Sequence, residues 1–173
     1  MPEGYAYNGG EDYVLDRGSP FVSAPLTSEE MSFVRDLLFV CPVRRWLLGH
    51  CYYNAQMLAV ADRTGQLRYV EGYAVGLACI PVLHGWCTLN GKVVDMTWRT
   101  AVKRQKGKFG DRVFGVIPDG WAYYGAEFRT EAVMGRLRRT KVASSYLDDI
   151  AYGFPLFQEP RVRSRVEVLR EPL

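Results

Sequence analysis

The sequence lacks a long apolar run. Of its 173 residues, 48% are apolar and 24% are charged. No apolar stretch is long enough to span a bilayer. The first ten residues are polar and glycine-rich, without the apolar segment typical of a signal peptide. We therefore expect a soluble, cytoplasmic protein that makes no membrane contact (host cytoplasm if it is phage-encoded).

The sequence also lacks a strong charge of one sign and regularly spaced cysteines. Its 22 basic and 19 acidic residues leave a net charge of +3, too small to indicate nucleic-acid binding by itself. The four cysteines follow no regular spacing, which favours reduced thiols. No P-loop, G-x-G-x-x-G or paired-carboxylate motif occurs, so no cofactor is expected.

The length and composition predict one α+β domain over residues 1–173, with N-terminal helices packed on a central antiparallel sheet. Residues 1–26 are rich in glycine and proline. We predict an irregular N-terminal arm there, which could hold a short strand at 13–15. We expect residues 27–150 to form the core and residues 151–173 a C-terminal tail.

Two helices are predicted before the sheet. Thr27 and Glu30 have the spacing of a capping box and begin the first helix. A second helix is predicted at about 50–62, with Cys51 and Asn54 on one face. Cys51 therefore lies at a helix N-terminus, where the helix dipole favours a negative charge.

A three-stranded antiparallel meander is predicted at about 67–75, 79–89 and 92–98. The second and third strands are joined by Asn90-Gly91, the strongest short hairpin signal. This register pairs His84 with residue 97 and residue 86 with Asp95. It places His84 and Asp95 on one face as diagonal neighbours, with backbones roughly 7 Å apart.

These residue types predict a thiol site. An aspartate can accept a hydrogen bond from one imidazole nitrogen of His84, which leaves the other nitrogen free to take a proton. A Cys–His pair is a common means of forming a thiolate nucleophile at neutral pH. We therefore predict a catalytic site of Cys51, His84 and Asp95, with first-turn N–H groups of the helix available to an oxyanion.

Five segments carry a resemblance to a known superfamily. They are CYYNA (51–55), YVEGYA (69–74), PVLHGW (81–86), GKVVDMTW (91–98) and AYYGAEF (122–128). Together they resemble small bacterial and phage-encoded members of the papain-like/transglutaminase-like thiol enzymes. The resemblance implies a core of that type. It also implies that Cys51 is the nucleophile, that His84 is the base and that Asp95 orients the base. The expected substrate is a peptide or protein bearing an amide, ester or thioester.

The sequence departs from that pattern at two places. Gly85 follows His84, where such enzymes more often carry alanine. No glutamine lies a turn and a half before Cys51, where the chain has two arginines, so a papain-style side-chain oxyanion donor is missing. A neighbouring tyrosine, Tyr52 or Tyr53, could donate instead.

Other residues near the predicted site have structural alternatives. Cys51 alone could be a small buried residue, and His50 points about 100° away from it around the helix. Asn54 could support the site or bond a neighbouring strand. Glu71 could contact substrate, although pairing with an arginine is favoured. The remaining supporting residues are Trp86 and Trp98. We expect both to pack in the core, and Trp86 could also shield the site from solvent.

Three functions compete at this point. The first is a thiol hydrolase or acyltransferase. The second is a catalytically silent papain-like fold that binds or inhibits a host protein. The third, nucleic-acid binding through the basic run at 99–108, is disfavoured by the small net charge. A zinc site at Cys79, His84 and Cys87 is also disfavoured, because strand alternation turns both cysteines away from His84.

Overall fold

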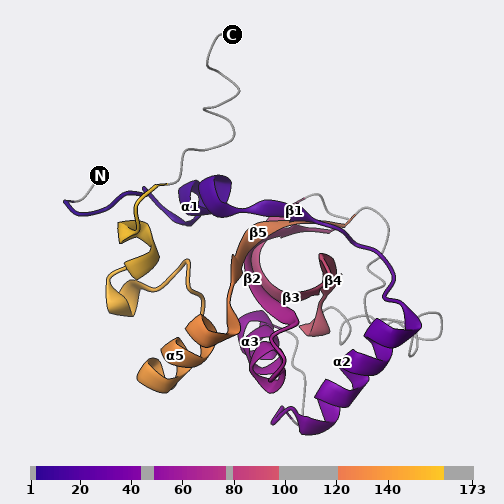
Figure 1. The fold of residues 1–173 in the computed structure, drawn as a ribbon. Coiled ribbons are helices and arrows are strands. Elements are labelled where there is room, and N and C mark those ends of the chain that lie inside the picture. Colours follow the sequence, from indigo (N-terminus) through magenta and orange to yellow (C-terminus); the bar gives the residue numbers. More distant parts are fainter. Residues whose placement is uncertain (1–2, 44–48, 77–79, 98–120, 162–173) are drawn as a thin grey trace.

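The structure is a computed structural model that describes residues 3–43, 49–76, 80–97 and 121–161. Four described helices surround a curled, antiparallel sheet of five strands in the order β1-β5-β2-β3-β4 (Figure 1). The strands are β1 Ser19–Phe21, β2 Leu67–Val75, β3 Pro81–Leu89, β4 Lys92–Val94 and β5 Ala122–Phe128. The helices are α1 Gly10–Arg17, α2 Ser28–Val40, α3 Cys51–Ala61 and α5 Thr130–Thr140, followed by the 3-10 turns η1 Ile150–Tyr152 and η2 Pro155–Gln158.

This arrangement confirms the predicted α+β class. Within the described ranges, no helix combines the length and apolar character needed to cross a bilayer.

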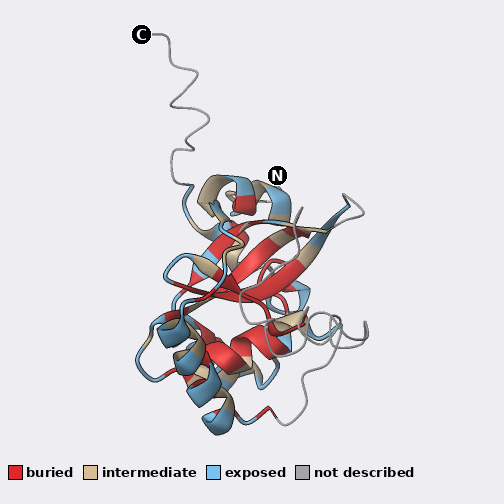
Figure 2. Ribbon diagram, turned by 90° about the vertical axis from the view of Figure 1, so that its right-hand side faces the viewer, coloured by how far each residue is buried: buried red, intermediate tan, exposed pale blue. Residues whose placement is uncertain are grey.

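The sheet separates two groups of buried residues. On one face, α3 packs against β2 and β3, and the Cys87 Sγ donates a hydrogen bond to the Ala55 carbonyl oxygen at 3.1 Å. The other face carries a smaller apolar cluster that includes Val70, Trp86 and Tyr123. Burial is concentrated where the sheet meets the helices (Figure 2).

Two local predictions are confirmed. Thr27 and Glu30 form the capping box of α2, because the Glu30 N–H bonds the Thr27 hydroxyl and the Glu30 carboxylate accepts the Thr27 N–H. Asn90 and Gly91 have φ values of 53° and 76°, as a two-residue hairpin turn requires.

The prediction of an irregular arm at residues 1–26 is wrong. Residues 10–17 form α1 and residues 19–21 form β1, which pairs with β5. The strand expected at 13–15 is helix, and both Tyr13 and Val14 are buried. Glu11 and Asp12 in the first turn and Arg17 in the last suit the helix dipole, a short-range signal that the glycine content obscured.

The expected C-terminal tail is also partly ordered into the core. Phe157, in η2, is buried, and its carbonyl accepts the N–H groups of Ala6 at 2.6 Å and Tyr7 at 3.1 Å. The two ends of the described chain therefore lie side by side.

The third strand of the meander is shorter than predicted. β4 ends at Val94 and pairs only with residues 87–89 of β3, so the expected pairing of His84 with Thr97 is wrong. The chain turns at Asp95, where the side-chain Oδ1 accepts the Thr97 N–H at 2.8 Å. An aspartate that bonds the backbone two residues on favours a turn over a continued strand.

Candidate active site

The turn after β4 directs the Asp95 carboxylate back toward β3. The Oδ2 atom lies 2.7 Å from Nε2 of His84, and both side chains are buried. The same Oδ2 accepts the Tyr123 hydroxyl at 3.1 Å. Oδ1 holds the Thr97 N–H, so three groups fix this carboxylate. The structure thus brings His84 and Asp95 together through a turn instead of the predicted strand pair.

Aromatic rings fix the plane of the His84 imidazole. Trp86 is fully buried, and its ring stacks on His84 with centroids 6.2 Å apart and planes 17° apart. Tyr123 approaches from β5, with its ring centroid 6.4 Å from that of His84. Trp86 therefore contacts the site directly, whereas Trp98 lies outside the described residues.

Cys51 is the first residue of α3 and is half-buried. Its side chain lines the same cavity as the His84 imidazole, and its interaction with His84 raises the pKa of that histidine. Since Nε2 of His84 bonds Asp95, Nδ1 is the nitrogen left for the thiol. The three residues therefore form a chain from thiol to imidazole to carboxylate.

The electrostatics of this chain favour a charged His84. Burial is the largest single influence on His84 and lowers its pKa. The charge and hydrogen bond of Asp95, followed by the hydrogen bond and charge of Cys51, raise the pKa further than burial lowers it, to about 10.

The thiol opens into a cavity of about 500 Å³. Its lining comprises Gly49, Cys51, Tyr52, Val82, Leu83, His84 and Thr97. Both Cys51 and His84 therefore line the same cavity.

The other described cysteines are buried away from solvent. Cys41 and Cys87 are buried, and each thiol donates to a helix carbonyl, at 3.6 Å to Met57 and 3.1 Å to Ala55. Burial raises the pKa of both thiols. Cys79 lies outside the described residues. Among the described cysteines, Cys51 alone lines a cavity beside a histidine.

Gly85 lets α3 approach the sheet. A Cβ added at Gly85 would lie 2.9 Å from Cδ1 of Tyr52, closer than real Cβ contacts. The close approach of Tyr52 thus explains why position 85 is a glycine. That glycine allows the first turn of α3, which carries Cys51, to lie directly over β3.

Two polar residues of the first α3 turn differ in their surroundings. Asn54 is buried and donates from Nδ2 to the Thr97 hydroxyl at 3.1 Å, which ties the helix to the Asp95 turn. His50 is the exposed N-cap of α3. Asn54 therefore links α3 to the segment that carries Asp95, and its predicted role in the site stays a prediction.

Glu71 has no arginine partner among the described residues, so that prediction is wrong. Its carboxylate accepts hydrogen bonds from the Ser145 hydroxyl, the Tyr69 hydroxyl and the backbone N–H groups of Tyr146 and Leu147. It is fully buried, and burial raises its pKa against these hydrogen bonds. Glu71 therefore secures the loop after α5.

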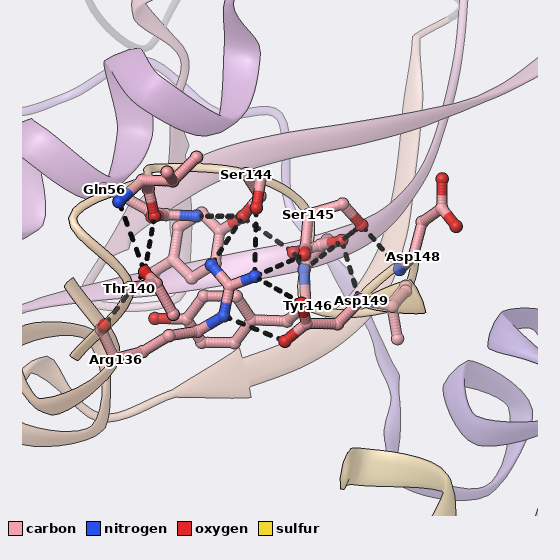
Figure 3. Close-up of polar contacts among 12 residues, drawn as sticks. Gln56, Arg136, Thr140, Ser144, Ser145, Tyr146, Asp148 and Asp149 are labelled. Carbon is pink, nitrogen blue, oxygen red and sulfur yellow. Dashed lines mark hydrogen bonds and ion pairs between the residues drawn. The ribbon is translucent and has the colours of Figure 1, made fainter. Parts of the chain in front are cut away.

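The buried arginine of the region belongs to α5. Arg136 forms an ion pair with Asp149 at 3.0 Å and donates to the Ser144 and Ser145 carbonyls (Figure 3). Burial raises the pKa of Tyr52, which lines the thiol cavity and also interacts with Ser145 of the same loop. No sequence motif signalled these loop contacts. Those of Glu71 join residues 74 to 76 apart, whereas those of Arg136 join residues 8 to 13 apart.

The described part of the chain contains no cluster of three or more His, Cys, Asp or Glu residues able to hold a metal ion. The site brings a thiol, an imidazole and a carboxylate together within a single chain.

No protein-family model, curated protein or solved structure matches this chain. The resemblance to papain-like/transglutaminase-like enzymes gains no support from these comparisons. The geometry around Cys51 is therefore the basis on which a function can be argued.

Proposed function

We propose that this protein is a thiol hydrolase or acyltransferase acting on an amide, ester or thioester. One observation carries the proposal. His84 is held between the Asp95 carboxylate, at 2.7 Å, and the Cys51 side chain, at the wall of a cavity. A nucleophile, a base and a group that orients the base are the parts that covalent acyl chemistry requires.

Transfer of the thiol proton to Nδ1 of His84 gives a thiolate–imidazolium pair, and in the first half-reaction the Cys51 thiolate attacks the acyl carbon. A C–S bond forms, and the carbonyl π electrons move onto oxygen. As the tetrahedral intermediate collapses, the bond to the leaving group breaks and His84 returns the proton to that group. Asp95 stays ionised and keeps the Nε2–H directed at itself.

In the second half-reaction, water or an amine attacks the thioester. His84 removes a proton from the attacking group. The C–S bond then breaks, which restores the thiolate of Cys51 and leaves the proton on His84. The N–H groups of the first α3 turn lack helical acceptors by geometry, so they are available to the oxyanion in both halves.

The first test is the alkylation of Cys51 by iodoacetamide as a function of pH, with mass spectrometry to separate the four cysteines. We expect Cys51 to react rapidly at neutral pH and Cys41 and Cys87 to react slowly. His84→Gln should lower the alkylation rate of Cys51 by roughly 10–100-fold at pH 7. Above about pH 9, where an ordinary thiol ionises, the rates of the native protein and the variant should become similar. His50→Gln is the matched control, because it removes the chain's other histidine.

The second test uses p-nitrophenyl acetate. An acetyl thioester should form on Cys51 with release of p-nitrophenolate, and Cys51→Ala should form none. Faster turnover on addition of an amine identifies acyl transfer, and an unchanged rate identifies hydrolysis. If Cys51 reacts like an ordinary thiol and His84→Gln leaves it unaffected, the proposal fails and the silent binding module takes its place.

A further inference from the structure

A second cavity, of about 480 Å³, lies beside the thiol cavity. Leu83 lines both cavities, so the two share one wall residue next to His84. Across the sheet, Leu83 pairs with Tyr73, which lines the second cavity. The two cavities therefore adjoin at Leu83.

The second cavity combines aromatic walls with acidic residues at its edge. Its rings come from both ends of the described chain and from β2: Tyr5, Tyr7, Tyr73, Phe154 and Phe157. Glu11 and Asp148 also line it, and both are exposed. Among its lining residues there is no lysine, arginine or histidine. The cavity is thus anionic where it meets solvent and apolar inside.

The arginines near this cavity are already paired within the protein. Arg17 donates to the Tyr7 hydroxyl at 3.0 Å and lies 3.4 Å from the Asp16 carboxylate. Arg161 lies over the Tyr7 ring, 5.2 Å from its centroid, and pairs with Asp12. No described lysine or arginine forms an ion pair with Glu11 or Asp148. Burial raises the pKa of Tyr73, another wall residue, to about 12, and Glu11 lies close enough for its charge to add to this rise.

The loop that carries Asp148 is held firmly. The Asp148 N–H donates to the Ser145 hydroxyl at 2.9 Å, and that hydroxyl also contacts Glu71 and Tyr52. The backbone of Asp148 is therefore fixed through Ser145, and its exposed carboxylate extends from that point at the edge of the second cavity.

We infer that the second cavity binds a positively charged aliphatic side chain of lysine type, carried on the substrate whose acyl group Cys51 attacks. This inference rests on the proposed function. The aliphatic stem lies against the aromatic walls, and the ammonium group meets Glu11 and Asp148 at the edge, where ring faces add cation–π attraction. The substrate class is thus a basic peptide or protein.

A matched pair of alkylating reagents tests this inference without a known substrate. N-(5-aminopentyl)iodoacetamide and N-pentyliodoacetamide both attach their CH₂ to Cys51 with loss of iodide, and only the first carries an ammonium group at pH 7. We expect the native protein to favour the ammonium reagent by about three- to tenfold. Glu11→Gln and Asp148→Asn together should bring the ratio to about one. Asp36→Asn, an exposed charge change on α2, should leave it unchanged.

Varying the length of the reagent distinguishes binding in the second cavity from non-specific electrostatic attraction. The preference should be smaller for a two-carbon amine than for the five-carbon amine, because the shorter stem does not carry the charge past Leu83. Equal preference at both lengths, or a ratio of one in the native protein, overturns the inference. Slow alkylation of Cys51 by both reagents and by iodoacetamide instead overturns the proposed function, so the two failures are distinguishable.

Discussion

Two buried polar clusters in this molecule each centre on a carboxylate, yet they differ in what they can do. The Cys51 site comprises Cys51, His84 and Asp95. The Arg136 cluster comprises Arg136 and Asp149 with their loop partners. In the Arg136 cluster, Nε, Nη1 and Nη2 of the arginine all donate to protein acceptors. In the Cys51 site, the last member of the chain is a thiol at the wall of a cavity.

The difference shows that burial of charge does not by itself mark a reactive site. A cluster whose donors and acceptors are satisfied by the protein holds segments together. A cluster that ends in a nucleophile facing open space can act on another molecule. The two clusters therefore predict opposite effects of substitution, on stability in one case and on thiol chemistry in the other.

The largest effect is expected at Arg136. Arg136→Met should lower the free energy of unfolding by about 3–5 kcal/mol, because it leaves the buried Asp149 carboxylate without its cation. Urea unfolding measures the loss, and Arg138→Met, exposed on the same helix, is the control. Under native conditions, the folded variant should keep its rate of Cys51 alkylation. A large fall in the alkylation rate with an unchanged free energy of unfolding would contradict the view that the Arg136 cluster serves stability and not thiol reactivity.

A pH-dependent effect is expected at Asp95. The folded protein raises the pKa of His84 from 6.5 to about 10, so it holds this proton more tightly than the unfolded chain does. The resulting stabilisation is complete below about pH 6.5 and is lost as the pH rises toward 10.

Asp95→Asn removes the carboxylate that raises this pKa. The stability difference between the native protein and the variant should therefore be larger at pH 5.5 than at pH 10. The expected change is about 1.4 kcal/mol or more, the equivalent of a tenfold change in proton affinity. Urea unfolding at both pH values measures it. A difference that is the same at both values would show that Asp95 does not control the His84 proton.

The smallest effect is expected at two adjacent tyrosines of β5. Tyr123→Phe and Tyr124→Phe each remove one hydroxyl hydrogen bond, at 3.1 Å to Asp95 and 3.2 Å to the Gly18 carbonyl. Each should cost about 0.5–1.5 kcal/mol of stability. Only Tyr123→Phe should raise the pKa of His84, because the Asp95 oxygen is then no longer shared. NMR titration of the imidazole distinguishes them, and identical His84 titrations would contradict the role of Tyr123.

Short-range signals predicted a good part of this molecule. The capping box of α2, the Asn90-Gly91 turn and the start of α3 all depend on residues close in sequence, and the structure contains all three. The proximity of His84 and Asp95 was also expected, but for a partly wrong reason. An aspartate at a strand end can form a side-chain-to-backbone turn, and that competing preference ended β4 at Val94.

Long-range contacts could not be predicted. Tyr123 reaches Asp95 from a strand 28 residues away, and Glu71 bonds the backbone near Tyr146. Such partners depend on how β5 inserts between β1 and β2, which no single segment encodes. The expectation of an arginine beside Glu71 followed from charge pairing, whereas backbone N–H groups and hydroxyls supply the donors.

The positions of the site residues along the chain also set an order of assembly during synthesis. Cys51, His84 and Asp95 fall within one stretch of 45 residues, so the nucleophile and its base leave the ribosome together. The second cavity needs Tyr5 and Tyr7 from one end and Phe154 and Phe157 from the other. Contacts between distant segments form late, since they must close a long loop first. In a nascent chain, the residues that line the second cavity are therefore all present only after those of the Cys51 site have been made.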